Sequence, residues 1–188
     1  LVSDEPYRGI VYEDVEVPWP VNHYRDTLHV TSFSKDLGLP GERIGYIGIN
    51  PACNFADGLR DAFTFTNRTL GFVNAPAFQQ RLVEGLLDVT VDMAGYTAKR
   101  ALLLDALEKA GYEVVKPYGA FYIFPKVPGG MDDVEFVNLC LEERLLVVPG
   151  SGFGTPGHFR MSYAVSDRDV EVAVQALQRV ADRIAAAS

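Results

Sequence analysis

The feature that most constrains the fold of this chain is a change in hydrophobic pattern near residue 75. Before it, short apolar runs at residues 28–30 and 44–49 are separated by clusters of glycine and proline, which is typical of buried strands joined by loops. After it, apolar residues recur at spacings of three and four, as at residues 96–110, which predicts helices. A chain that combines both patterns is expected to fold as an α/β protein.

The second half of the sequence predicts a small α+β unit. Residues 75–87, 96–110 and 132–143 are expected to be helical, and residues 119–125, 145–148 and 159–165 are expected to be strands. Gly111 is a plausible helix stop, and Ser166 followed by Asp169 resembles a capping box that opens a last helix. That helix carries an apolar stripe of Val170, Val174, Leu177 and Ala181.

Composition and charge exclude several classes of function. The 188 residues carry a formal net charge of −8, which argues against a nucleic-acid partner. No apolar run approaches the roughly 20 residues that span a bilayer, so no membrane association is expected. Cys53 and Cys140 lie far apart, and the three histidines have no zinc-type spacing. We therefore expect a cytoplasmic protein with reduced thiols and no structural metal.

The beginning of the sequence suggests a longer parent chain. Leu1 and Val2 look like the end of a buried strand that runs directly into polar residues, and no initiator Met precedes them. Because a strand needs roughly 5 residues to pair usefully, we expect that the sequence is a fragment.

The segment from Ser32 to Gly45 holds the densest arrangement of chemically useful side chains. Lys35 follows Ser32 by three positions, and Arg43 comes eight positions after the lysine. A lysine that acts as a nucleophile needs apolar or cationic surroundings, because these favour its neutral amine. Serine and arginine together suit a phosphate, through hydroxyl and guanidinium hydrogen bonds. The segment therefore predicts a site for a phosphorylated carbonyl cofactor.

This segment, SFSKDLGLPGERIG, resembles the lysine region of the fold type I pyridoxal phosphate enzymes, and within them the class I and II aminotransferases of the aspartate aminotransferase kind. The resemblance implies that Lys35 forms a Schiff base with pyridoxal phosphate and shuttles the proton. It also implies that Ser32 and Arg43 bind the cofactor phosphate.

Two further elements extend the resemblance. The run from Ser3 to Tyr7 is similar to the family's Asp-x-x-Tyr element, which would place Asp4 at the pyridinium nitrogen and Tyr7 at the phenolic oxygen of the ring. A carboxylate at that nitrogen keeps the ring protonated and able to withdraw electrons. Taken alone, Tyr7 is also consistent with a core aromatic, and Asp4 with a turn or cap residue ahead of Pro6, but their spacing to Lys35 favours the functional roles.

The other element is a glycine-rich loop that leads to Arg160. Residues 147–163 resemble the family's loop before the arginine that binds the substrate α-carboxylate, so Arg160 is expected to have that role. A planar guanidinium binds a carboxylate through two parallel hydrogen bonds. The loop is expected to precede a strand rather than a helix, which argues against a dinucleotide-binding loop.

The resemblance covers essentially all residues and implies the C-terminal half of a subunit. Residues 1–90 are expected to be the C-terminal part of a large cofactor-binding domain with a mainly parallel sheet, and residues 91–188 a small α+β domain that starts with a long linking helix. The expected activity is amino-group exchange between an amino acid and a 2-oxo acid, with aspartate and 2-oxoglutarate among the candidates. A homodimer, or a complementary N-terminal polypeptide, is expected as partner, and the fragment alone is expected to be inactive.

Two alternatives stay open from the sequence. A lyase or decarboxylase of the same fold would use the same lysine and phosphate ligands. An aminotransferase-like effector domain of a transcription regulator would bind the cofactor without turnover, although no basic DNA-binding segment is present.

Overall fold

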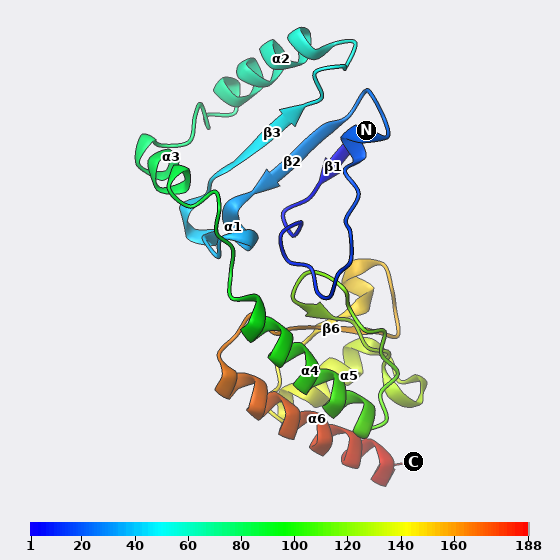
Figure 1. Ribbon diagram of the computed structural model, residues 1–188. Helices are drawn as coiled ribbons and strands as arrows, with labels where there is room; N and C mark the ends of the chain where they lie inside the picture. Colours follow the sequence, from blue (N-terminus) through cyan, green and yellow to red (C-terminus); the bar gives the residue numbers. More distant parts are fainter. Residues whose placement is uncertain (188) are drawn as a thin grey trace. The chain divides into compact units, whose positions relative to one another are not determined.

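Two small sheets, each in its own unit, organise this chain (Figure 1). The computed structural model describes residues 1–187. One unit is Leu1–Val91 and the other begins at Asp92. In chain order the elements are β1 (Val2–Asp4), η1 (Pro20–Asn22), β2 (Leu28–Ser32), α1 (Phe33–Asp36), η2 (Pro40–Glu42), β3 (Gly45–Ile49), α2 (Ala56–Thr69), α3 (Ala77–Glu84), α4 (Met93–Lys109), β4 (Tyr122–Ile123), η3 (Pro128–Gly130), α5 (Asp133–Glu142), β5 (Val148–Pro149), η4 (Gly150–Phe153), β6 (Phe159–Ser162) and α6 (Asp167–Ala187).

The sheet of the first unit has the strand order β1-β2-β3. β1 and β2 are parallel, with Asp4 opposite Val30, whereas β2 and β3 are antiparallel, with Ser32 opposite Gly45. The α/β class is confirmed, but the expected parallel character holds for only one of these two pairings. The chain between β2 and β3 is short and holds only the two helical turns α1 and η2, so it suits the return of an antiparallel strand rather than a parallel crossover.

The first two residues behave differently from the sequence expectation. A strand does form here, but Leu1 and Val2 are 61% and 64% exposed. The expectation that they are buried is wrong for the described structure, because β1 is an edge strand of its sheet. The amino group of Leu1 donates a hydrogen bond to the carbonyl of Asp26 at 2.7 Å.

Helix α2 lies in a region that the sequence pattern assigned to strands and loops. None of its side chains is buried, and only Ala56, Leu59 and Phe63 are half-buried. These three residues follow a helical spacing, but the stripe is narrow, and threonine, glycine and asparagine lower the helix propensity around it. The prediction of a strand-and-loop region is therefore wrong at α2.

The second unit packs three helices against the antiparallel sheet β4-β6-β5. Helices α4 and α6 lie side by side, as Figure 1 shows. Its core contains large side chains that are at most 1% exposed: Leu103, Leu107, Phe136, Phe159, Tyr163 and Leu177. The predicted apolar faces of the two long helices thus supply much of this core.

Two predicted helix boundaries in this unit are confirmed by their hydrogen bonds. Gly111 has a φ of +80°, and its N–H donates to Glu108 while the N–H of Tyr112 donates to Leu107, which is the Schellman arrangement. Ser166 accepts from the N–H of Asp169 at 3.2 Å and donates its hydroxyl to the Asp169 carboxylate at 2.7 Å. Within the described residues, no helix has both the length and the apolar character needed to cross a membrane.

Candidate functional site in the first unit

The strand directions bring candidate residues to one edge of the first sheet. Asp4 ends β1 and Ser32 ends β2, and the carboxyl ends of parallel strands share an edge. Because β3 runs the other way, its first residue, Gly45, lies at that same edge, two positions after Arg43. Open α/β sheets bind ligands beyond the carboxyl ends of their parallel strands.

Lys35 lies in α1, the single helical turn that directly follows β2 (Figure 1). Its Nζ is 5.7 Å from the centre of the Tyr7 ring, within the range of a cation–π contact. Tyr7 follows the end of β1 by three residues. The structure therefore brings Lys35 and Tyr7 together, although the sequence separates them widely.

The turn that carries Arg43 is held close to the end of β2. A Cβ on Gly45 would lie 2.4 Å from the Thr31 carbonyl oxygen, so only glycine fits this approach. Arg43 itself has a φ of 51°, in the left-handed region, and its Nη1 donates to the Pro40 carbonyl at 2.9 Å. The exposed Arg43 guanidinium and Ser32 thus belong to adjoining segments, joined by the Ser32–Gly45 pair.

Sequence reasoning did not single out Asp36, which anchors the lysine turn. Its carboxylate is half-buried and accepts a hydrogen bond from the backbone of Gly9, and burial raises the pKa of this carboxyl. Its carbonyl accepts from the N–H of Val91 at 2.9 Å and from the hydroxyl of Thr90 at 3.0 Å. The available sequence signal was its position directly after Lys35.

A second feature that the sequence did not reveal is a network of charges behind Tyr7. The Glu5 carboxylate contacts Arg8 Nη1 at 2.6 Å and His29 Nδ1 at 3.3 Å, and the Arg8 guanidinium lies 3.4 Å from the centre of the Trp19 ring. Burial alone would raise the pKa of Glu5, but hydrogen bonds from Ser3, Arg8 and His29 outweigh it and lower that pKa. The network fixes the start of the loop between β1 and β2.

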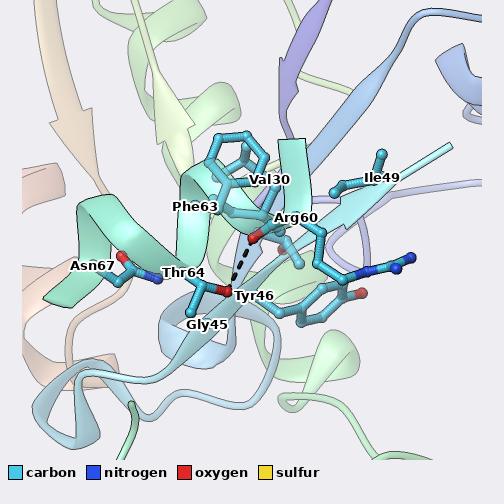
Figure 2. Close-up of a pocket in the computed structure, with 10 residues that line it drawn as sticks. Val30, Gly45, Tyr46, Ile49, Arg60, Phe63, Thr64 and Asn67 are labelled. Atoms are coloured by element: carbon cyan, nitrogen blue, oxygen red, sulfur yellow. Dashed lines mark hydrogen bonds between the residues drawn. The ribbon is translucent and has the colours of Figure 1, made fainter. Parts of the chain in front are cut away.

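Two cavities of this unit differ in their relation to the candidate residues. One, of about 580 Å³, lies between the sheet and α2 and contains none of them (Figure 2). Figure 2 shows Arg60, Thr64 and Asn67 along α2 beside this cavity, and a dashed line marks the hydroxyl of Thr64 donating to the Arg60 carbonyl, a distance of 2.9 Å. The smaller, of about 280 Å³, is lined by Ser32 among others and adjoins the edge described above.

Arg160 belongs to the second unit and is held by aromatic side chains there. It lies in β6 opposite Val148, and its Cζ is 4.5 Å from the centre of the Tyr122 ring and 3.9 Å from that of Phe153. The glycine-rich loop before it leads into β6, as the sequence predicts. Among the described residues, no group of three or more His, Cys, Asp or Glu side chains is placed to hold a metal ion.

The functional groups of the candidate residues in the first unit indicate which kind of ligand they can bind. It combines an amine, a hydroxyl, a guanidinium, a phenol and a carboxylate, on Lys35, Ser32, Arg43, Tyr7 and Asp4. The amine suits an aldehyde, the hydroxyl and guanidinium suit a phosphate, and the carboxylate suits a protonated ring nitrogen. These residues therefore fit a phosphorylated pyridine aldehyde.

Comparison with known proteins gives a consistent answer. The model of the family "Aminotransferase class I and II" matches residues 1–177. An aspartate aminotransferase of Thermotoga maritima is 30% identical over 185 residues, which cover 97% of this chain and 46% of the relative. An aspartate/prephenate aminotransferase of Thermus thermophilus is 31% identical, over 97% of this chain and 48% of the relative.

Solved structures agree with the sequence comparisons. An aminotransferase from Eubacterium rectale superposes with a TM-score of 0.89 at 38% identity, covering 97% of this chain and 46% of that one. The chain thus spans about half the length of the relatives it matches. Because the family model matches nearly the whole sequence, the chain belongs to the class I and II aminotransferase family.

Proposed function

We propose that the protein containing this chain is a pyridoxal phosphate-dependent aminotransferase, which exchanges an amino group between an amino acid and a 2-oxo acid. The observation that carries the proposal is the placement of Asp4, Ser32 and Lys35 at one edge of the sheet, with Lys35 against Tyr7. The aminotransferases of this family are pyridoxal phosphate-dependent, and several relatives are named aspartate aminotransferases. Aspartate and 2-oxoglutarate are accordingly our proposed substrate pair.

Each candidate residue has a distinct proposed part in holding the cofactor. Lys35 would hold it covalently through Nζ, and Ser32 and Arg43 would bind its phosphate. Asp4 pairs with the ring nitrogen, and Tyr7 donates its hydroxyl to the phenolic oxygen of the ring. When bound, the cofactor supplies an aldehyde that takes up the amino group and a ring that withdraws electrons from the reacting carbon.

The remaining steps fall to side chains of this chain. Lys35 would accept the α-proton of the substrate at its Nζ and hold it for return. Arg160 binds the α-carboxylate with its planar fork, which orients the amino group for reaction. Lys35 as proton acceptor and Arg160 as carboxylate ligand are thus the contributions that we propose for this chain, beside those that hold the cofactor.

The two units correspond to a proposed domain division. We propose that residues 1–90 form the C-terminal part of the large cofactor-binding domain and residues 91–188 the small domain, within the C-terminal half of a subunit. A homodimer, or a complementary N-terminal polypeptide, is the proposed partner, and a cytoplasmic location is part of the same proposal. A lyase or a non-catalytic effector domain is not favoured, because the relatives reported above are aminotransferases.

The test is replacement of Lys35 by Ala in the protein that contains this chain. We expect loss of the covalent cofactor adduct after borohydride reduction, measured by mass spectrometry of the peptides, because the nucleophilic amine is gone. Lys109→Ala is the matched control, since this exposed lysine pairs with Asp105 on the surface of α4. An adduct that persists on another lysine in the Lys35→Ala protein would overturn the assignment.

A further inference from the structure

The orientation of the Arg160 guanidinium depends on two aromatic rings of the second unit. Tyr122 belongs to β4, which pairs directly with β6, so its position is set by the sheet. Phe153 is the last residue of η4, a single turn of 3₁₀ helix in the glycine-rich loop, and its ring is the nearer of the two to Arg160. Whatever fixes η4 therefore also fixes one wall of the guanidinium site.

Helix η4 is tied to the start of α5 by one buried carboxylate. Asp133 is 2% exposed, and its Oδ2 accepts from the backbone N–H of Ser151 at 2.5 Å. The Ser151 N–H, followed by the Ser151 hydroxyl, is the main cause that lowers the pKa of Asp133, so the carboxylate is charged at neutral pH. A charge in this position persists only because it is hydrogen-bonded.

The residue that caps the start of α5 is not Asp133. The cap of α5 is the preceding residue, Asp132, whose exposed carboxylate accepts from the N–H groups of Val134 and Glu135. Asp132 therefore caps α5, whereas the carboxylate of Asp133 takes its main hydrogen bond from Ser151 in η4 and further ones from the N–H groups of Asp133 and Val134.

Backbone packing makes the loop a stiff connector rather than a flexible one. The N–H of Gly150 donates to the His158 carbonyl at 2.7 Å, and a Cβ on Gly150 would lie 2.3 Å from the Thr155 carbonyl oxygen. Since Ser151 and Phe153 both belong to this short turn, we expect a change at Ser151 to reach Phe153.

We propose that Asp133 is a positioning residue for substrate binding: by holding η4 through Ser151, it keeps Phe153 on the Arg160 guanidinium and sets the plane in which Arg160 receives a carboxylate. The inference rests on the proposed function, because it takes Arg160 as the group that binds the substrate α-carboxylate. Asp133 itself contacts neither substrate nor cofactor.

The experiment compares Asp133→Asn with Asp132→Asn in the cofactor-loaded protein that contains this chain. For an amino acid donor, Asp133→Asn is expected to raise KM by roughly fivefold with little change in kcat, because the amide oxygen of Asn still accepts from Ser151 but without the charge that strengthens the hydrogen bond. For the corresponding amine without a carboxylate, kcat/KM should stay at the wild-type level. Asp132→Asn should change neither, because asparagine is an equally good helix cap.

A second variant tests the same contact without changing Asp133, so the result does not depend on the stability of the Asp133→Asn protein. Phe153→Leu leaves the Asp133–Ser151 hydrogen bond in place but removes the ring, and should produce the same carboxylate-specific loss. In the double variant, the rise in KM for the amino acid should be no greater than the larger of the two single-variant effects, because both changes act through one contact. Additive losses, or equal losses for the amino acid and the amine, would overturn the role of Asp133.

The same measurements separate this inference from the function on which it rests. If Arg160→Lys leaves the kinetics with amino acids unchanged, the proposed role of Arg160 fails. If Arg160→Lys lowers kcat/KM while Asp133→Asn does not, only the positioning role of Asp133 is overturned.

Discussion

The guanidinium of Arg160 lies between two aromatic rings, and a lysine ammonium does not reproduce its flat, two-pronged shape. We expect Arg160→Lys to keep the charge but lose the paired hydrogen bonds to a carboxylate. The loss in kcat/KM should correspond to about 2 kcal/mol, or roughly 30-fold, for amino acid substrates in general. Steady-state kinetics with several amino acids measure this.

Arg168→Lys is the matched control for that change, because Arg168 is exposed on α6 and lies outside the proposed site. Its kinetics should match those of the wild type. Wild-type kcat/KM values in the Arg160→Lys protein would contradict the role assigned to the fork.

The two cysteines differ sharply in reactivity because only one of them is buried. Burial raises the pKa of Cys140 to about 12, so its thiol stays protonated at pH 8, whereas Cys53 is half-buried. Since the thiolate is the reactive form, alkylation with iodoacetamide should label Cys53 and spare Cys140. Peptide mapping by mass spectrometry checks this. Both sites should react in denaturant, and equal labelling of the native protein would count against the burial of Cys140.

At the residue scale, the sequence predicted only those groups whose motif is local. Lys35, Ser32 and Arg43 lie in one continuous segment, so their shared chemistry is visible without a structure. Asp36 and Asp133 were not predicted as anchors, because their partners are backbone N–H groups of distant residues. Because nearly every residue type has a backbone N–H, the type of the partner residue does not indicate such a contact.

At the scale of single elements, the start of α6 offers a clean test of helix capping. Ser166→Ala removes the oxygen that accepts from the N–H of Asp169, and should lower the free energy of unfolding by about 1 kcal/mol. Urea denaturation followed by circular dichroism measures the change. Ser166→Thr retains a capping hydroxyl and should stay near the wild type, and an unchanged midpoint for Ser166→Ala would show that the cap contributes nothing.

Helices of the second half were predictable because their apolar spacing and their end signals agree. Helix α4 has both a buried stripe that includes Leu103 and Leu107 and a glycine at its end. Two predicted strands differ from the observed ones: residues 119–125 yield only the two-residue strand β4, and of residues 145–148 only Val148 belongs to a strand, β5 (Val148–Pro149). The length of each strand in this three-stranded sheet depends on how far the adjacent strand extends beside it. A run of apolar residues in the sequence does not reveal that length.

At the scale of the whole molecule, the buried core is distributed unevenly. Of the 22 buried apolar residues found within the described part of the chain, only Ile10, Tyr12, Ile44 and Val83 belong to the first unit. Helices α2 and α3 also expose large aromatic side chains, with Phe65 69% and Phe78 71% exposed. Few buried contacts imply a low free energy of local opening.

We therefore expect hydrogen exchange to divide this chain into a fast and a slow part. Amides of α2 and α3 should exchange with little protection, whereas those of α4 and α6 should be protected by the core that they share. Mass spectrometry of this chain after a series of labelling times measures both in one sample. Equal protection of α2 and α4 would mean that the first unit is stabilised by contacts other than its own core.

The mixed strand directions of the first sheet also imply an order of events as the chain folds. β2 and β3 are joined by the short, locally bonded segment that carries Lys35 and Arg43, so their pairing closes only a small loop. β1 joins β2 across the much longer stretch between Asp4 and Leu28, which contains no α-helix. Because closing a longer loop costs more entropy, we expect the hairpin to form first and β1 to dock afterwards. The lysine and the arginine would then be in place before Asp4 and Tyr7 join them at the same edge of the sheet.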